Sequence, residues 1–266
     1  MRVSIDTAIH FSLVSPEDGI RLAREAGYDS VELGFRPGVE MSTYQGWLRQ
    51  YGVTVDTVSF GAQICNPDEA TRQDAVVKAR QLFQSGIELG CRHFISELNG
   101  KPGSAESRAS FRRSMTDLLP TMEREGLHMS FECHPGDFIE DSNATVDMLR
   151  EVDSPHVGYL FCAPHTFTMG GDVGGMARYA GRTISHVHIA DTFKEERIIK
   201  DPPNLGVRTH LHLQPGLGEV DFATFFEALR EIGYDGTLAV VAFSHRFDRA
   251  FETARATREW LRQNIA

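Results

Sequence analysis

Histidines and carboxylates gather at the ends of the later apolar segments of the chain. Glu132 and His134 are two residues apart in one such segment, and His186 and His188 are two residues apart in another. In a strand, side chains two residues apart point to the same face, so each pair presents its donors together. Imidazole and carboxylate donors suit zinc, manganese and similar divalent ions.

The number of such positions strengthens the case for a metal. Six of the eleven histidines fall at or just beyond three consecutive predicted strand ends: His134, His165, His186, His188, His210 and His212. One histidine in such a position is as readily a hydrogen-bonded structural residue as a ligand, but six at neighbouring ends favour a bound divalent ion. Two carboxylates also stand near strand ends, Glu97 at the end of the fourth predicted strand and Asp191 after the seventh.

A long connection follows the seventh predicted strand. About 30 residues, from 191 to 220, separate that strand from the next helix, and they include three prolines and three glycines. Loops of this length inside a domain are usually functional or disordered. This loop carries Arg208, His210 and His212, so we expect it to reach the same site.

Alternating strands and helices must bring these residues together. A glycine that ends an amphipathic helix just before an apolar strand recurs at Gly27, Gly52, Gly90, Gly126 and Gly233. We expect strands at 2–8, 30–35, 54–60, 93–98, 128–133, 157–162, 184–190 and 237–243, and helices at 16–26, 42–51, 68–89, 105–125, 142–151, 172–181, 222–232 and 248–264. Eight such units predict an α/β chain folded as one (β/α)8 TIM barrel domain over residues 1–266, in which the carboxyl ends of the strands converge.

The charge and composition of the chain limit the kinds of partner and compartment that we expect for it. The formal net charge is -10, which repels a nucleic acid backbone. The N-terminal segment reads directly into a strand, without the apolar run of a signal peptide or a membrane span. The four cysteines have no disulfide or zinc-module spacing. We therefore expect a cytoplasmic protein that binds neither nucleic acid nor membrane.

Several segments resemble a known family. AGYDSVEL, SFECHP, HVHIADT, PGLGEVDF and GYDGTLAV are similar to strand-end motifs of sugar phosphate isomerases and epimerases of the xylose isomerase-like family, which includes endonuclease IV. The likeness runs through almost the whole chain and is strongest from about residue 124 to 240. The resemblance implies a metal bracketed by Glu132, an Asp-x-x-His motif at 162–165, His188 and a last glutamate at position 241. Cys162 and Val241 depart from that pattern, so the usual four-ligand site and two-carboxylate proton shuttle would be incomplete here.

Similarity to endonuclease IV implies a second arrangement. In that enzyme a metal lies between the histidine of the strand-six motif and an Asp-x-His pair in the loop after strand seven. The matching residues are His165, His210 and His212, with Glu132 and His188 either joining as ligands or binding substrate. Cys162 is then expected to be a buried structural thiol, and Arg208 resembles a substrate-contacting residue of the epimerases.

The resemblance and the donors together favour a metal-dependent isomerase or epimerase of a sugar, keto-sugar or polyol, acting through an enediolate-type intermediate. With Val241 unable to act as a base, we expect Glu97, Glu132 or His134 to move the proton, since imidazole titrates near neutrality. One alternative is a metal-dependent lyase of the C-glycoside deglycosidase or keto-sugar dehydratase type, which would act with a second subunit in the deglycosidase case. Another is a barrel that binds sugar without converting it. Pairing into a homo-oligomer through the outer helices is also open.

Overall fold

Eight parallel strands close into a barrel in the computed structural model, which describes residues 1–61, 63–194, 211–242 and 249–265. Each strand pairs with the next, and β1 pairs with β8 to close the ring. The strands are β1 (Arg2–Asp6), β2 (Ser30–Leu33), β3 (Thr54–Ser59), β4 (His93–Glu97), β5 (His128–Glu132), β6 (Val157–Cys162), β7 (Ile184–Ile189) and β8 (Thr237–Val240). All eight lie within the expected segments, so the predicted barrel is confirmed.

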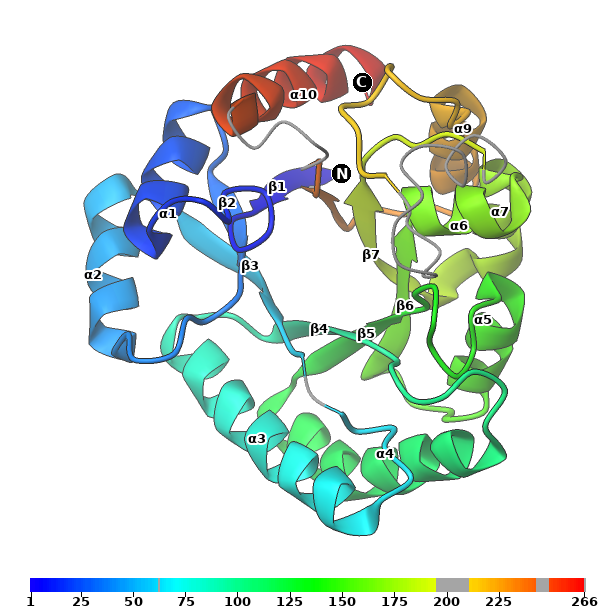
Figure 1. The fold of residues 1–266 in the computed structure, drawn as a ribbon. Helices are drawn as coiled ribbons and strands as arrows, with labels where there is room; N and C mark the ends of the chain where they lie inside the picture. The colour runs from blue at the N-terminus through cyan, green and yellow to red at the C-terminus, as the bar shows by residue number, and fades with distance from the viewer. Residues whose placement is uncertain (62, 195–210, 243–248, 266) are drawn as a thin grey trace.

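Helices surround this barrel, as the view along its axis shows (Figure 1). They are α1 (Pro16–Glu25), α2 (Met41–Tyr51), α3 (Glu69–Glu88), α4 (Ala105–Glu125), α5 (Ser142–Arg150), α6 (Ala163–Gly170), α7 (Val173–Ala180), α9 (Phe222–Glu231) and α10 (Ala250–Asn264), with a short 3-10 turn, η1, at Gly181–Thr183. The glycine junctions behave as expected, because Gly52 and Gly126 cap α2 and α4 in the left-handed conformation.

One helix was not predicted. The segment after β6 was expected to be a loop that leads to a helix at 172–181, but α6 begins immediately after Cys162. Its N-cap makes no side-chain hydrogen bond, so the usual polar start signal is missing from the sequence. As a result, His165 sits in the first turn of a helix, close to the carboxyl end of β6.

The main apolar core lies between the strands and the outer helices. Aromatic pairs join the two layers: Phe83 with Phe94, Phe111 with Phe131, and Phe161 with Phe225. The interior of the barrel differs, because its apolar cluster consists of Ile95, Leu160 and Cys162. Barrel interiors are usually filled with branched apolar side chains. The polar residues beside this small cluster are therefore candidates for function.

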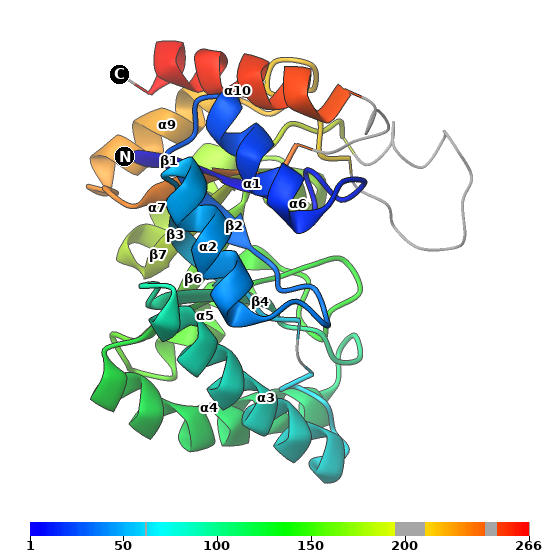
Figure 2. The same cartoon turned by 90° about the vertical axis from the view of Figure 1, so that its left-hand side faces the viewer.

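The two ends of the barrel are easy to distinguish. Both termini lie on one side in Figure 2, at the end where the strands begin.

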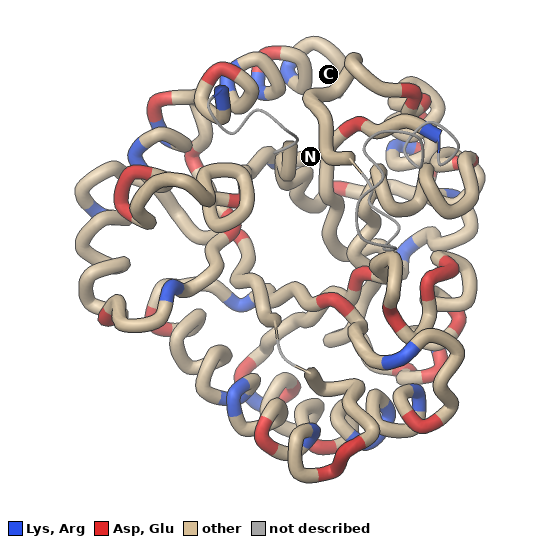
Figure 3. Tube along the Cα trace, in the orientation of Figure 1, with Lys and Arg blue, Asp and Glu red and all other residues tan. Residues whose placement is uncertain are grey.

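The outer helices carry charges of both signs. Lys and Arg are interspersed with Asp and Glu around them (Figure 3). None of the described helices combines the length and apolar character that crossing a bilayer requires.

Candidate metal centre

Strand alternation turns four reactive side chains toward the barrel axis. Residues on either side of them belong to the outer core, as Val31 and Leu33 do around the buried Glu32 of β2. The same alternation applies to Glu132 on β5, Cys162 on β6 and His188 on β7, whose neighbours Phe131, Phe161 and Val187 pack outward. These four side chains therefore meet near the carboxyl ends of their strands.

Two histidines face each other above this ring. The Nε2 atoms of His165 and His212 are 3.3 Å apart, and both side chains are buried. The Nδ1 atom of His212 donates a hydrogen bond of 2.9 Å to the carbonyl oxygen of Val241. Because a carbonyl can only accept, the neutral ring keeps its Nε2 lone pair turned toward His165. Burial and the proximity of His165 hold the pKa of His212 well below its usual value, so this ring is neutral.

Glu132 lies between two of the histidines. Its Oε1 atom is 2.7 Å from Nδ1 of His165 and 3.8 Å from Nδ1 of His188. Burial raises the pKa of Glu132, but the interactions with His165 and His188 outweigh burial and hold that pKa well below the usual range. The site therefore contains an ionised carboxylate surrounded by imidazole rings.

Glu32 is a buried carboxylate beside these residues that the sequence did not predict as part of the site. Its Oε2 atom accepts hydrogen bonds from Thr57 Oγ1 at 2.8 Å and His186 Nε2 at 3.1 Å, and both of its oxygens lie 3.3 Å from His188 Nε2. Burial raises the pKa of Glu32, but His188 and His186 outweigh it and lower the pKa. One feature of the sequence could have identified it. Glu32 is the only charged residue in the apolar strand SVELGF, and a carboxylate buried in such a strand needs polar partners.

Asp6 stands beside Glu32 on the neighbouring strand β1. Burial and the negative charge of Glu32 raise the pKa of Asp6 well above its usual value, and its Oδ1 atom accepts a 2.7 Å hydrogen bond from the backbone N–H of Ile9. The negative charge of Glu32 therefore favours the protonated form of Asp6.

Asp191 holds the base of the loop that carries His212. Backbone bonds between Asp191 and Leu213 run in both directions at 2.7 and 2.8 Å. The carboxylate also accepts hydrogen bonds from the backbone N–H groups of Thr192, Gly216, Gly218 and Val220, at 2.8 to 3.1 Å. A side chain at position 218 would meet Asp191 Oδ1 at 2.3 Å, so the turn requires glycine there. Asp191 is thus a positioning residue for His212 and was expected only as a nearby carboxylate.

Two other expected residues lie at the edge of the site. His134 is half-buried, and its ring makes an edge contact with His165 at 4.7 Å between centroids. Glu97 is exposed at the end of β4, where it is paired in register with Glu132. Arg208 and His210 lie outside the described residues. The structure therefore brings together Glu132, His165, His188 and His212, with His134 and Glu97 at the rim.

The donors present fit a tetrahedral metal ion. Two nitrogens bonded to one zinc ion at about 2.0–2.1 Å would lie about 3.4 Å apart, close to the 3.3 Å between His165 and His212. Potential ligand atoms of three triads lie within 4.8 Å of one another: Cys162, His165 and His212; Glu132, Cys162 and His188; and Glu32, His186 and His188. In the last triad, the short distances are explained by hydrogen bonds from His186 and His188 to Glu32. The first two triads therefore form the candidate metal centre.

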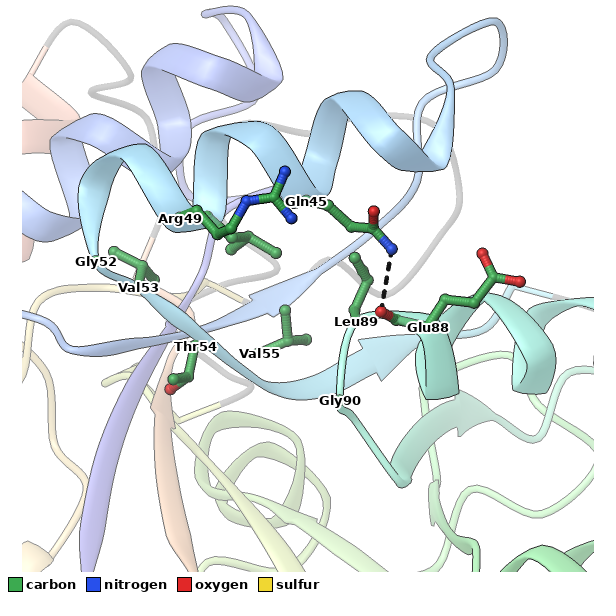
Figure 4. Close-up of a pocket in the computed structure, with 10 residues that line it drawn as sticks. Gln45, Arg49, Gly52, Val53, Thr54, Val55, Glu88, Leu89 and Gly90 are labelled. Atoms are coloured by element: carbon green, nitrogen blue, oxygen red, sulfur yellow. Dashed lines mark hydrogen bonds between the residues drawn. The ribbon is translucent and has the colours of Figure 1, made fainter.

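A pocket between α2 and α3 lies far from this centre. It has a volume of about 650 Å³ and is lined by Gln45, Gly52, Thr54 and Glu88 among others (Figure 4). Thr54 is the first residue of β3, so the pocket is near the end of the barrel opposite the metal-ligand candidates. Its lining holds one acidic and one basic side chain and no histidine or cysteine. We therefore do not assign the chemistry to it.

Comparison with known proteins agrees with this fold. The model of the xylose isomerase-like TIM barrel family matches residues 20–264. A ketose 3-epimerase from Arthrobacter globiformis is 24% identical, with 88% of this chain and 80% of that protein covered. An inosose dehydratase from Geobacillus kaustophilus (strain HTA426) is 25% identical, with 82% and 77% covered.

A solved structure extends the likeness to the whole barrel. The IOLI protein with a binding zinc atom superposes with a TM-score of 0.83 at 17% identity, covering 100% of this chain and 98% of that one. This similarity shows the fold. The relatives include enzymes of two reaction types, epimerisation and dehydration.

Proposed function

The chain belongs to the xylose isomerase-like TIM barrel family, and from that premise we propose that it is a metal-dependent isomerase or epimerase of a sugar, keto-sugar or polyol. The observation that carries the proposal is the ionised Glu132 between His165 and His188, under the Nε2 lone pair of His212. This arrangement offers a buried base beside a set of metal ligands. The ketose 3-epimerase relative supports the substrate class.

The proposed cofactor is a divalent metal ion, zinc or manganese. The ion would take its ligands from among Glu132, His165, His188 and His212, with His210 of the same loop as a further candidate. The zinc atom in the similar IOLI structure supports a divalent ion here. When bound, such an ion acts as a Lewis acid that polarises a carbonyl or hydroxyl of the substrate and stabilises an enediolate-type intermediate.

The chain's own groups move the proton. Glu132 is ionised and lies inside the site, so it is the first candidate to take a proton from the carbon next to the carbonyl. His134 lies beside His165, and the exposed Glu97 can exchange a proton with solvent. Arg208 is proposed to bind substrate, and His188 to do so if it is not a ligand.

A second candidate function is elimination by a lyase. The specific observation is Val241, which follows β8 and accepts a hydrogen bond from His212 through its backbone carbonyl but has no side-chain acid or base. A site with fewer carboxylates fits removal of a proton and a leaving group from one face better than epimerisation across two faces. The inosose dehydratase relative supports this alternative.

Solvent deuterium exchange separates these functions. We expect the metal-loaded protein to incorporate deuterium at the carbon next to the carbonyl of a ketose or an inosose, measured by proton NMR across a panel of both. Glu132→Gln should reduce the exchange by about 100-fold or more. Product analysis then distinguishes an epimer from a dehydrated enone. Binding of a sugar with no exchange in any member of the panel would favour the non-catalytic barrel instead.

We also propose a cytoplasmic location. Its support is chemical, because Cys65, Cys91, Cys133 and Cys162 are all free thiols, as expected in a reducing compartment.

A further inference from the structure

Cys162 occupies the one position shared by the two candidate metal triads. It is the last residue of β6, it is buried, and it points into the barrel with Ile95 and Leu160. The sequence alone favoured an inert structural thiol here. An inert thiol would need only apolar neighbours, and Cys162 has these on one side only.

The other side of Cys162 faces metal-binding atoms. Its Sγ atom lies within 4.8 Å of ligand nitrogens of His165 and His212, and also within 4.8 Å of ligand atoms of Glu132 and His188. The remaining three cysteines belong to none of the triads found among the described residues. Cys133, the nearest in sequence, turns outward toward Ser142 and Tyr159.

We propose that Cys162 is a thiolate ligand of the metal centre, and that the centre therefore selects zinc or a similarly thiophilic ion over manganese or magnesium. The inference rests on the proposed function, because it concerns the same ion. On binding, the S–H bond breaks, a bond from sulfur to the ion forms, and the proton leaves to the buffer. Soft thiolate ligands favour zinc, whereas oxygen donors suit manganese and magnesium.

Cobalt(II) substitution tests this assignment directly. The full chain, freed of metal, is titrated with cobalt(II) while the near-ultraviolet absorption is recorded, since a thiolate bound to cobalt gives a charge-transfer band that imidazole and carboxylate ligands do not. We expect the band in the unaltered protein and in Cys133→Ser, the matched control. We expect no band in Cys162→Ser or Cys162→Asp.

The aspartate variant also tests selectivity. It replaces the thiolate with an oxygen ligand, so Cys162→Asp should lower the ratio of zinc to manganese affinity by on the order of tenfold or more. Cobalt bound at one equivalent without the band, in the unaltered protein, would overturn the thiolate ligand and leave the proposed function standing. If no cobalt binds at all, both the thiolate ligand and the metal centre of the proposed function are wrong.

Discussion

The Nε2 atom of His188 lies 3.3 Å from both carboxylate oxygens of Glu32, a residue 156 positions earlier in the chain. Because the ionised Glu32 can only accept a hydrogen bond, Nε2 of His188 carries a hydrogen. The opposite nitrogen, Nδ1, then faces Glu132 at 3.8 Å. Glu32 therefore decides which atom of His188 is turned toward the metal-ligand candidates.

Replacing Glu32 should weaken metal binding without removing any proposed ligand. Second-layer carboxylates that orient a histidine ligand typically contribute a factor of about 10–100 to metal affinity, so we expect a loss of that size in Glu32→Gln. Calorimetric titration with zinc measures it. Burial lowers the pKa of His188, but Glu32, Cys162 and Glu132 outweigh burial and hold that pKa well above its usual value. Nitrogen NMR of the metal-free protein should therefore show His188 titrating at a lower pH in Glu32→Gln.

Glu123, which is exposed on the outer helix α4, provides the control for this variant. Glu123→Gln should keep the zinc affinity and the His188 spectrum of the unaltered protein. An unchanged affinity and spectrum in Glu32→Gln would show that Glu32 only fills space in the barrel.

The stability of the metal-free protein should fall in mild acid because of His10. Burial lowers the pKa of His10 from 6.5 to about 4, while its Nε2 atom donates to the carbonyl oxygen of Ala250 at 2.8 Å. The unfolded chain therefore binds a proton at pH values where folded His10 does not. By linkage, this one residue removes about 2 kcal/mol of folding stability between pH 7 and pH 5.

A glutamine at position 10 keeps a donor but cannot titrate in this range. The loss of stability from pH 7 to pH 5 should accordingly be about 2 kcal/mol smaller in His10→Gln, as measured by urea denaturation at both pH values. An equal loss in the two proteins would mean that His10 is protonated or exposed in the folded state.

Asp191 should affect the metal centre through His212. Each carboxylate oxygen of Asp191 accepts backbone N–H groups. Asp191→Asn replaces one of these oxygens with an NH2 group that cannot accept, at a cost near that of a buried charged hydrogen bond, about 1.5–3 kcal/mol. We expect faster hydrogen exchange over residues 211–220 and weaker zinc binding. Asp235→Asn, an exposed aspartate before β8, is the control and should change neither. Weaker zinc binding with unaltered exchange in the loop would contradict the positioning role.

The barrel could be predicted from local patterns because most of its units repeat the same signals. Glycine at a helix end and a short apolar strand are properties of neighbouring residues, and together they placed all eight strands. Helix α6 was not predicted, because Cys162 provides no polar N-cap and Pro164, by sequence alone, indicates the end of regular structure and not the start of a helix. Local signals therefore located the elements but not every helix start.

The candidate site was only partly predictable. Its histidines were recognisable because they cluster at strand ends, and Glu132, His165, His188 and His212 do come together. Glu32 was not recognisable as part of the site, because its contact with His186 depends on closing the barrel across 154 residues. The role of Cys162 likewise depends on distances between strands that no spacing in the sequence reveals.

Elemental analysis of bound metal tests the central claim, a metal centre at His165 and His212 beside Glu132. The purified chain and the variants His165→Gln and His212→Gln are incubated with zinc, desalted and analysed, with His156→Gln as the control because His156 bonds Leu127 at the far end of the barrel. We predict one equivalent of zinc in the unaltered protein and in the control, and a clear loss in both site variants. The absence of bound ion from the unaltered protein after incubation with zinc or manganese, or equal zinc in all four proteins, would contradict the metal centre.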